Sequence, residues 1–229
     1  MPPSPQVLLQ DITPPGLPAG VAVWRLALDA QNVALDALLP LLPADEQARC
    51  LRYRQPAHRL RFAAARVALR RLLAERLQIA VQAVALRIDG FGKPRLAGGE
   101  GLHFNLSHSK NYALIALSAR QPVGVDIEAV GSPAGDWPVA TALTPAERRH
   151  CSEQAHAEAG TLAFFRIWSG KEAVLKALGL GIADHLQSVS VVPGPSGRYA
   201  VAFDIPAPPL QAWALPAPAG FVAALALLD

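Results

Sequence analysis

The stretch between Thr161 and Gly181 constrains the fold more than any other part of this chain. It reads TLAFFRIWSGKEAVLKALGLG, a run of helix-forming residues that Thr161 can cap and that Gly179 can end in a left-handed conformation. Glu172 and Lys176 are one turn apart, on the side that begins with two aromatic residues. We therefore predict a helix that carries a charged pair along its apolar edge.

The charged pair has two interpretations that this stretch leaves open. On an exposed face it would stabilise the helix by about 0.2–0.5 kcal/mol. In a buried cleft it would offer an anion and a cation to a ligand. Gly170, inside the helix, costs about 1 kcal/mol relative to alanine, which indicates a requirement other than helix formation at that position.

The size and composition of the chain indicate a globular protein. Its 229 residues suffice for one domain or two small ones, and 52% of them are hydrophobic. Proline, arginine or polar residues interrupt every apolar run before it reaches a membrane-spanning length. The start, Met1–Pro5, lacks the basic and apolar regions of a secretory signal, so we expect a cytoplasmic protein. Cys50 and Cys151 form neither a disulfide framework nor a metal-ligand pattern.

Basic residues are distributed unevenly. Nine of the 21 are arginines between Arg49 and Arg76, in a chain of net charge +3. Such a segment can bind nucleic acid or a small polyanion. Because core-type residues alternate with the arginines and no nucleic-acid motif is present, we favour the small polyanion. The four lysines all fall in the motif-like stretches described here: Lys93, Lys110, Lys171 and Lys176.

Local patterns predict strands, then helices, then strands, in each half of the chain, without a residue-level repeat. The expected strands are residues 21–26, 86–88, 101–106, 112–118, 122–128, 188–192, 198–203 and 221–227. The expected helices are residues 44–54, 56–77 and 161–178, and the capping box Thr144–Glu147 opens one more.

Two carboxylates share one face of an expected strand. Alternation puts Val125 and Ile127 on one side and Asp126 and Glu128 on the other, with backbones roughly 7 Å apart. Like charges at this distance repel unless a cation or a proton intervenes. The pair either forms the polar face of an edge strand or joins Glu172 in an oxygen site suited to Mg²⁺.

Two connections carry groups that suit a phosphate or a flat ligand. In Gly92-Lys93-Pro94, the glycine permits close backbone approach and the proline keeps Lys93 extended. Ser107 and His108 lie between two expected strands, in a connection rich in hydrogen-bond donors. An ordinary polar turn is the alternative for each.

Together, four stretches resemble in order and spacing the signatures of the single-chain, Sfp-type 4'-phosphopantetheinyl transferases. They are Gly92–Pro94, Phe104–Ser109, Gly124–Glu128 and Trp168–Gly179. The resemblance runs from about Arg49 to Gly181. It implies an α+β fold of two similar halves around coenzyme A, with the adenosine and 3'-phosphate side in residues 1–120 and the metal and pyrophosphate site in residues 121–229.

The resemblance also implies an activity. It is the Mg²⁺-dependent transfer of the phosphopantetheine arm of coenzyme A to a serine of an apo carrier protein, acyl or peptidyl, with release of adenosine 3',5'-bisphosphate. Cleaving a pyrophosphate requires neutralised charge, which a metal and a lysine supply. The expected partners are coenzyme A and a carrier protein, with no nucleic acid and no membrane, and the chain is expected to be a monomer.

Roles for individual residues follow from the same resemblance. Asp126, Glu128 and Glu172 would be the metal ligands, and Lys176 would contact the pyrophosphate. Asp126, Glu172 and Lys176 are the implied catalytic residues, with Glu172, or a water that it orients, as the candidate base. The implied coenzyme A contacts are Gly92, Lys93, Pro94, Ser107, His108, Lys176 and, as candidates for the 3'-phosphate, Arg49, Arg59 and Arg66.

Three other functions compete with this one. A non-catalytic module would bind coenzyme A or a carrier protein without transfer. A Mg²⁺-dependent hydrolase would act on the phosphopantetheine linkage of a holo carrier. A small basic nucleic-acid binder would show salt-sensitive binding to generic strands. Retention of Asp126, Glu172 and Lys176 favours the transferase over the non-catalytic module.

Overall fold

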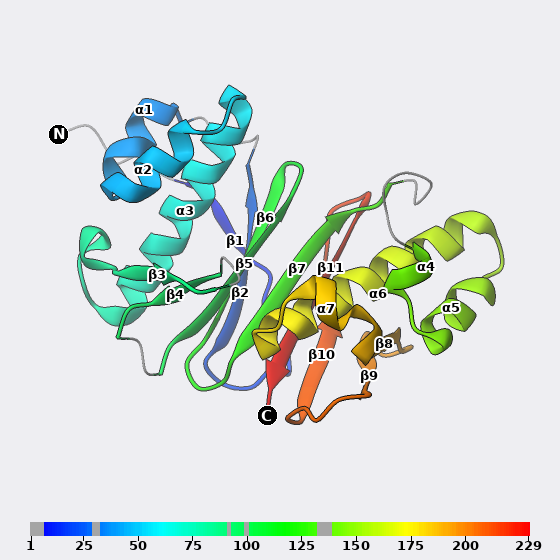
Figure 1. Cartoon of the computed structure of the whole chain (residues 1–229). Coiled ribbons are helices and arrows are strands. Elements are labelled where there is room, and N and C mark those ends of the chain that lie inside the picture. The colour runs from blue at the N-terminus through cyan, green and yellow to red at the C-terminus, as the bar shows by residue number, and fades with distance from the viewer. Residues whose placement is uncertain (1–6, 29–32, 91–92, 99–100, 132–138) are drawn as a thin grey trace.

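A computed structural model describes residues 7–28, 33–90, 93–98, 101–131 and 139–229, and its ribbon forms two lobes side by side (Figure 1). The helices are α1 (Leu35–Leu38), α2 (Ala44–Leu51), α3 (Pro56–Leu77), α4 (Val139–Ala142), α5 (Pro145–Ser152), α6 (Ala157–Leu178) and α7 (Ile182–His185). Short 3-10 segments lie at Leu39–Leu41, Val81–Ala83 and Leu186–Ser188.

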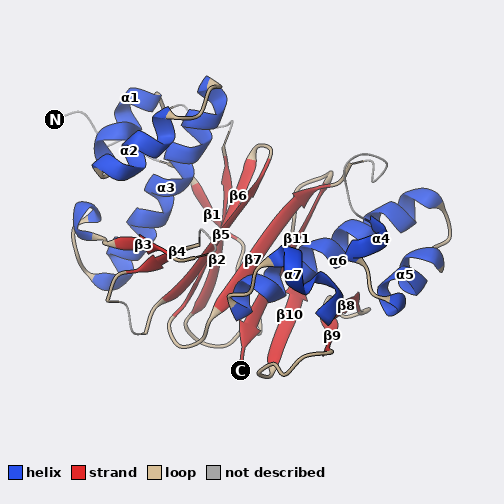
Figure 2. Cartoon of the chain, in the orientation of Figure 1, coloured by secondary structure: helices blue, strands red, loops and turns tan. Residues whose placement is uncertain are grey.

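The strands form two main antiparallel sheets and two hairpins, seen in red in Figure 2. One sheet has the order β1 (Leu9–Asp11), β2 (Val21–Ala27), β6 (Tyr112–Ser118), β5 (His103–Ser109). The other has the order β10 (Leu210–Ala214), β11 (Phe221–Leu228), β7 (Val123–Ala129). The hairpins pair β3 (Leu86–Ile88) with β4 (Pro94–Leu96) and β8 (Val189–Pro193) with β9 (Tyr199–Phe203). This mixture of helices and antiparallel sheets confirms the predicted α+β class.

The core of the first lobe lies between α3 and the four-stranded sheet. Pro56 occupies the first turn of α3, and Gln78 ends the helix in a left-handed conformation, as the predicted bounds require. Two arginines of this helix, Arg66 and Arg70, are buried. Arg70 Nε donates to Glu46 Oε2 at 2.7 Å, and this charge pairing allows the arginine to be buried.

Helix α6 crosses the face of the three-stranded sheet. It ends as predicted, because Gly179 has a φ of 73°. The predicted start at Thr161 is wrong. The helix begins at Ala157, because the Nδ1 atom of His156 accepts a hydrogen bond from the Ala159 amide at 3.1 Å and caps the helix one turn earlier.

Two glycines allow α6 to approach its neighbours closely. A Cβ atom on Gly124 of β7 would lie 2.0 Å from the Ala173 carbonyl oxygen, so a side chain there would push helix and sheet apart. A Cβ on Gly170 would lie 2.7 Å from Val191 Cγ1. This contact is the requirement, other than helix formation, that the sequence indicated at Gly170.

A buried ion pair ties α6 to α5. The predicted capping box of Thr144 and Glu147 is present at the start of α5. Lys171 Nζ donates to Glu147 Oε2 at 2.6 Å, and both side chains are fully buried. Glu147 Oε1 accepts from the Val191 amide at 2.7 Å. This carboxylate therefore links α5, α6 and β8.

Replacing Lys171 with methionine should destabilise the protein by about 3–5 kcal/mol, because Glu147 would keep a buried charge without its cation. Denaturant unfolding measures the change. A second replacement, Glu147→Gln, should recover part of the loss in the double variant. A cost below about 1 kcal/mol for Lys171→Met would show that the backbone donors to Glu147 suffice.

The two lobes meet along β5 and β7, which lie next to each other without a backbone ladder among the described residues. Side chains of β5 bridge this seam. Asn105 Oδ1 accepts from the Val125 amide at 2.8 Å, and Ser109 Oγ accepts from the Ala129 amide at 3.1 Å. The seam thus aligns a polar face of β5 with the strand that carries the two carboxylates.

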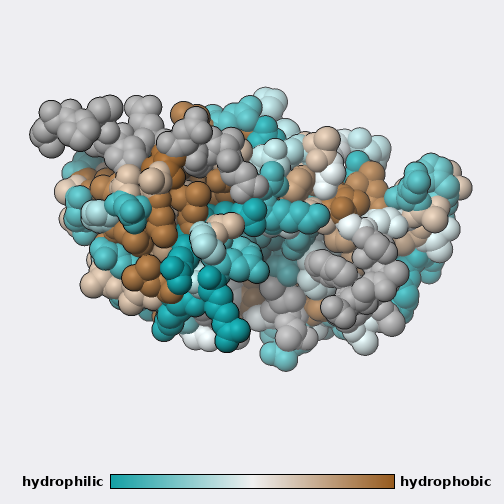
Figure 3. All heavy atoms as spheres, turned by 90° about the horizontal axis from the view of Figure 1, so that it is seen from above, coloured by the Kyte–Doolittle hydropathy of each residue, from teal (hydrophilic) through white to brown (hydrophobic). Residues whose placement is uncertain are grey.

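Three strands were not predicted, β1, β4 and β10, and β5 runs to Ser109 rather than ending at Leu106. The connection after β5 is therefore the two residues Lys110 and Asn111, with Lys110 at a φ of 48°. Seen from above, apolar side chains gather on the side of the first lobe and polar ones spread across the middle (Figure 3). Of the helices in the described ranges, none has the length and hydropathy needed to cross a membrane.

Candidate functional site

A cavity of about 320 Å³ lies where the two lobes meet. Side chains from α2, α3, β5, β7 and α6 reach it, so it draws on both halves of the chain. Its lining residues are Arg49, Tyr53, Phe62, Ala65, Arg66, Pro94, Leu106, Ser107, His108, Asp126, Glu128, Glu172 and Lys176. Nine of these were predicted as site residues from the sequence.

Lys176 is the central cation of this cavity. Its Nζ donates to Asp126 Oδ1 at 2.6 Å and to Ser107 Oγ at 3.2 Å, and lies 3.4 Å from Glu172 Oε2. Ser107 Oγ itself donates to Asp126 Oδ1 at 2.8 Å. Although burial disfavours the ammonium, Asp126 and Glu172 raise the pKa of Lys176 above its ordinary value. The lysine is therefore charged at neutral pH.

The three predicted carboxylates surround the same space. Asp126 is almost fully buried, although β7 is an edge strand of its sheet, and its Oδ2 atom has no hydrogen-bond partner in the described structure. Burial and then Asp126 raise the pKa of Glu128 to about 7, while a hydrogen bond from Ser109 opposes the rise. Burial also raises the pKa of Glu172, with Lys176 opposing it and Asp126 adding to it. Burial and the charge of Asp126 thus both act against ionisation of the two glutamates.

The donor set fits a hard divalent cation. Within the described ranges, no three His, Cys, Asp or Glu side chains stand in a ready-made metal cluster. Lys176 occupies Asp126 Oδ1, but Asp126 Oδ2 is a buried oxygen left without a partner, which costs about 1–3 kcal/mol. Carboxylate oxygens with few protein ligands are typical of Mg²⁺, which retains waters or takes phosphate oxygens.

The three arginine candidates differ in whether they line the cavity. Arg49 and Arg66 line the cavity, and their guanidinium carbons lie 5.6 and 5.5 Å from the centre of the Phe62 ring. The Nε and Nη1 atoms of Arg66 are buried and have no hydrogen-bond partner among the described residues; Glu46 Oε1 is 3.5 Å from Nε. Arg59 does not line the cavity, and its Nε donates to the Tyr53 carbonyl at 2.7 Å.

The Gly92-Lys93-Pro94 loop reaches the site in part. Pro94 lines the cavity, whereas Gly92 falls outside the described residues. Lys93 Nζ points to the end of α6 and donates to the Lys176 carbonyl oxygen at 2.6 Å. Burial and then Arg95 lower the pKa of Lys93 to about 8.

Sequence reasoning missed three residues that shape this site. Phe62 places Arg49 and Arg66 on one ring, and no spacing along the chain indicates that contact between two helices. Asn105 and Ser109 alternate with Ser107 along β5. Alternation along a strand is the sequence signal that could have placed these three polar residues on one face. Ser109 Oγ donates to Glu128 Oε2 at 3.1 Å.

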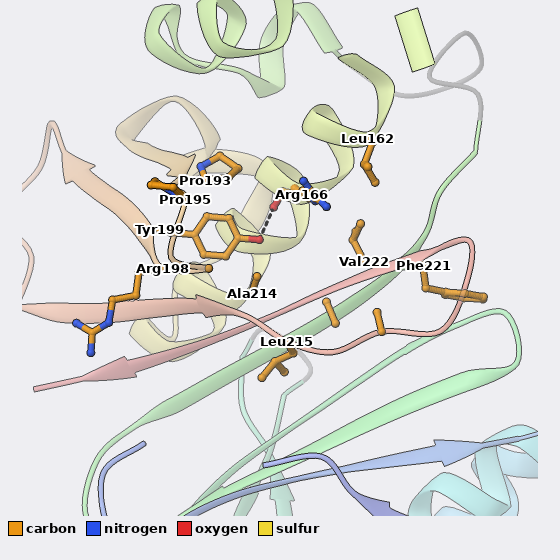
Figure 4. A pocket seen from close by; sticks show the side chains of 14 residues that line it. Leu162, Arg166, Pro193, Pro195, Arg198, Tyr199, Ala214, Leu215, Phe221 and Val222 are labelled. Atoms are coloured by element: carbon orange, nitrogen blue, oxygen red, sulfur yellow. Dashed lines mark hydrogen bonds between the residues drawn. The ribbon is translucent and has the colours of Figure 1, made fainter. Parts of the chain in front are cut away.

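A second cavity, of about 410 Å³, lies between the first half of α6, the β8–β9 hairpin and the strands β10 and β11 (Figure 4). Tyr199 points into this region, and its hydroxyl donates to the Arg166 carbonyl at 3.2 Å. No residue predicted as a site residue lines it. The chemistry indicated by the sequence therefore lies outside this second cavity.

Two family models match consecutive parts of the chain. The one described as the 4'-phosphopantetheinyl transferase superfamily matches residues 122–226. The one described as 4'-phosphopantetheinyl transferase, N-terminal, matches residues 29–120. The boundary between the two matches lies between β6 and β7. The cavity residues up to His108 precede this boundary, and those from Asp126 onward follow it.

Curated relatives carry related names. The chain is 35% identical to the 4'-phosphopantetheinyl transferase HetI of Nostoc sp. over 179 residues, 77% of this chain and 75% of the relative. It is 31% identical to a phosphopantetheinyl transferase of Thraustochytrium sp. over 192 residues, 76% of this chain and 66% of the relative. It is 30% identical to the 4'-phosphopantetheinyl transferase psf-1 of Bacillus pumilus over 169 residues, 73% and 71% of the two chains.

Proposed function

Because this chain belongs to the 4'-phosphopantetheinyl transferase superfamily of enzymes, we propose that it transfers the phosphopantetheine arm of coenzyme A to a serine of an apo carrier protein. Adenosine 3',5'-bisphosphate is the second product, and the reaction depends on Mg²⁺. We also propose that residues 1–120 and 121–229 are the two halves of the enzyme. Coenzyme A and the carrier serine meet between them.

One observation carries the proposal. A single cavity holds two arginines, one lysine and three carboxylates, contributed by helices and strands from both lobes. A substrate with a 3'-phosphate at one end and a pyrophosphate in the middle needs cations at both places. Arg49 and Arg66 supply the first, and Lys176 the second. Pro94, Ser107 and His108 supply the remaining contacts to the nucleotide.

The reaction forms one bond and breaks one. The carrier serine Oγ attacks the phosphorus that bears the pantetheine, and the bridging oxygen leaves with adenosine 3',5'-bisphosphate. Lys176 balances the charge that builds up on the pyrophosphate oxygens. The serine proton passes to Glu172 or to a water that it orients. When bound through Asp126, Glu128 and Glu172, Mg²⁺ would supply further positive charge to the same oxygens.

Intact-mass spectrometry tests the function. A panel of apo carrier proteins from fatty-acid, polyketide and peptide synthetases is incubated with this chain, coenzyme A and Mg²⁺. We expect a mass gain of one phosphopantetheine group on the carrier serine and its loss in EDTA. Saturable coenzyme A binding without any mass gain would favour a non-catalytic module. Loss of the group from holo carriers would favour a hydrolase.

The same cavity predicts how the enzyme selects its nucleotide. Replacing Arg66 with glutamine should lower the preference for coenzyme A over 3'-dephospho-coenzyme A by about 10- to 100-fold, because a charge-assisted hydrogen bond contributes about 1.5–3 kcal/mol. The ratio of the two kcat/KM values measures this preference. It compares two substrates on one variant, so a general loss of stability cancels.

Arg52→Gln is the matched control. Arg52 is exposed at the end of α2 and does not line the cavity, so the same loss of charge there should leave the substrate ratio unchanged. An unchanged ratio in Arg66→Gln would exclude Arg66 from the 3'-phosphate site and direct attention to Arg49.

A further inference from the structure

Lys93 makes a contact that links the two halves of the chain away from the phosphate-binding groups. Its ammonium donates to the Lys176 carbonyl oxygen at 2.6 Å, across 83 positions of sequence. Among the described residues, this carbonyl is the one hydrogen-bond acceptor of the ammonium. Lys93 and Pro94 follow each other in the chain, but Pro94 lines the cavity and Lys93 does not.

The carbonyl that Lys93 contacts belongs to the last turn of α6. Helix carbonyls at this end lack partners within the helix and carry partial negative charge. Gly179 N–H reaches the Lys176 oxygen only at 3.3 Å, so Lys93 provides the shorter hydrogen bond. A cation at a helix C-terminus is favourable, and here the cation comes from the other lobe.

Hydrogen bonds of Asp89 connect the two sides of the hairpin that carries Lys93. Asp89 Oδ1 accepts from the Lys93 amide at 3.0 Å, and Asp89 Oδ2 accepts from Arg95 Nε at 2.8 Å. These bonds link Asp89, just after β3, to residues at the start of β4. Arg95 also lies against the helix end, because a Cβ on Gly179 would be 3.0 Å from one of its guanidinium nitrogens. The hairpin therefore contacts the end of α6 through both Lys93 and Arg95.

Lys176 is consequently held at both ends. Its backbone is fixed by Lys93, and its ammonium is fixed by Asp126 and Ser107. We propose that the Lys93 ammonium is a positioning group, which acts on the reaction through the backbone of Lys176. This inference rests on the proposed transfer reaction. Lys93 is half-buried, which lowers its pKa, and the hydrogen bond to the Lys176 carbonyl offsets part of the cost of desolvating this cation.

A double-mutant cycle on kcat and KM tests the proposal. Lys93→Met should lower kcat by about 10- to 100-fold, since a displacement of about 1 Å in a charged group has effects of this size, and leave the KM for coenzyme A within about twofold. In a Lys176→Met background the same change should alter kcat by less than about threefold, because the group that it positions is absent.

Arg87→Met is the matched control. Arg87 is an exposed cation on β3 of the same hairpin and makes no hydrogen bond or ion pair to α6 among the described residues, so its loss changes the charge alone. We expect its kcat and KM to match those of the unaltered protein. A raised KM in Lys93→Met at constant kcat, or an equal effect of Lys93→Met in both backgrounds, would overturn the proposal in favour of direct contact with the nucleotide.

Amide hydrogen exchange separates this inference from the proposed function. If the unaltered protein transfers nothing to any carrier, the proposed function fails, but the helix contact can still be measured. Amides in the last turn of α6 should exchange at least about tenfold faster in Lys93→Met than in Arg87→Met. Equal exchange in the two variants would show that Lys93 does not hold the helix end.

Discussion

Replacing Asp126 with asparagine should lower turnover by about 10³-fold or more at saturating coenzyme A and Mg²⁺. The substitution keeps the size of the side chain and an oxygen that can accept the hydrogen bond from Ser107. It removes the charge that faces Lys176 at 2.6 Å and the buried Oδ2 atom that has no partner among the described residues. We therefore expect the variant to fold normally and to lack activity.

Initial rates of carrier modification, followed by intact mass, measure this loss, and thermal unfolding verifies the fold. Asp204→Asn is the control, because Asp204 is exposed just after β9 and lies far along the chain from the cavity residues. It should retain full activity. Turnover of Asp126→Asn within about threefold of the unaltered protein would exclude Asp126 from the metal site.

Replacing Lys176 with methionine should lower kcat by about 10²- to 10³-fold, with a smaller change in the KM for coenzyme A. The size is that of removing one preorganised donor from a developing negative charge. Because the interaction strengthens in the transition state, its loss should affect kcat more than ground-state binding. Steady-state kinetics with coenzyme A varied at a fixed carrier concentration separate the two constants.

Lys110→Asn is the control. It removes a cation at the end of β5 that does not line the cavity. Lys110 is exposed in the β5–β6 connection at a φ of 48°, a conformation that asparagine tolerates. Its kinetics should be unchanged. If Lys176→Met retained its kcat and showed only a higher KM, the lysine would bind the substrate equally in ground and transition states.

The motifs with a short period were the most predictable part of this protein. Alternation along β7 placed Asp126 and Glu128 on one face, and steps of three and four placed Glu172 and Lys176 together on α6. The structure brings all four to one cavity. These features depend on spacing within one element, which the sequence contains directly.

Features that depend on contact between elements were not predictable in the same way. Arg49, Arg59 and Arg66 were equivalent candidates in sequence, and only the packing of α2 against α3 puts two of them on the Phe62 ring. The start of α6 was misplaced because His156, a less usual cap than Thr161, ends the preceding loop.

The short strands escaped prediction for a related reason. Strands β1 and β4 are three residues each, and β4 begins with Pro94. Proline and short length are both typical of edges rather than of strand interiors, so a local pattern gives little signal. Their pairing is set by partners elsewhere in the chain, Trp24–Leu26 for β1 and Leu86–Ile88 for β4.

The side-chain seam between β5 and β7 gives the enzyme a built-in reporter of how far its lobes separate. Among the described residues, the amides of Val125 and Ala129 are bonded by Asn105 and Ser109 of the other lobe, and a hydrophobic cluster that contains Leu114 and Val125 spans the same seam. Separation of the lobes would therefore break this apolar contact and release the two amide protons to solvent together. Their exchange rates would then follow the breathing of the cleft, a motion that global unfolding experiments do not resolve.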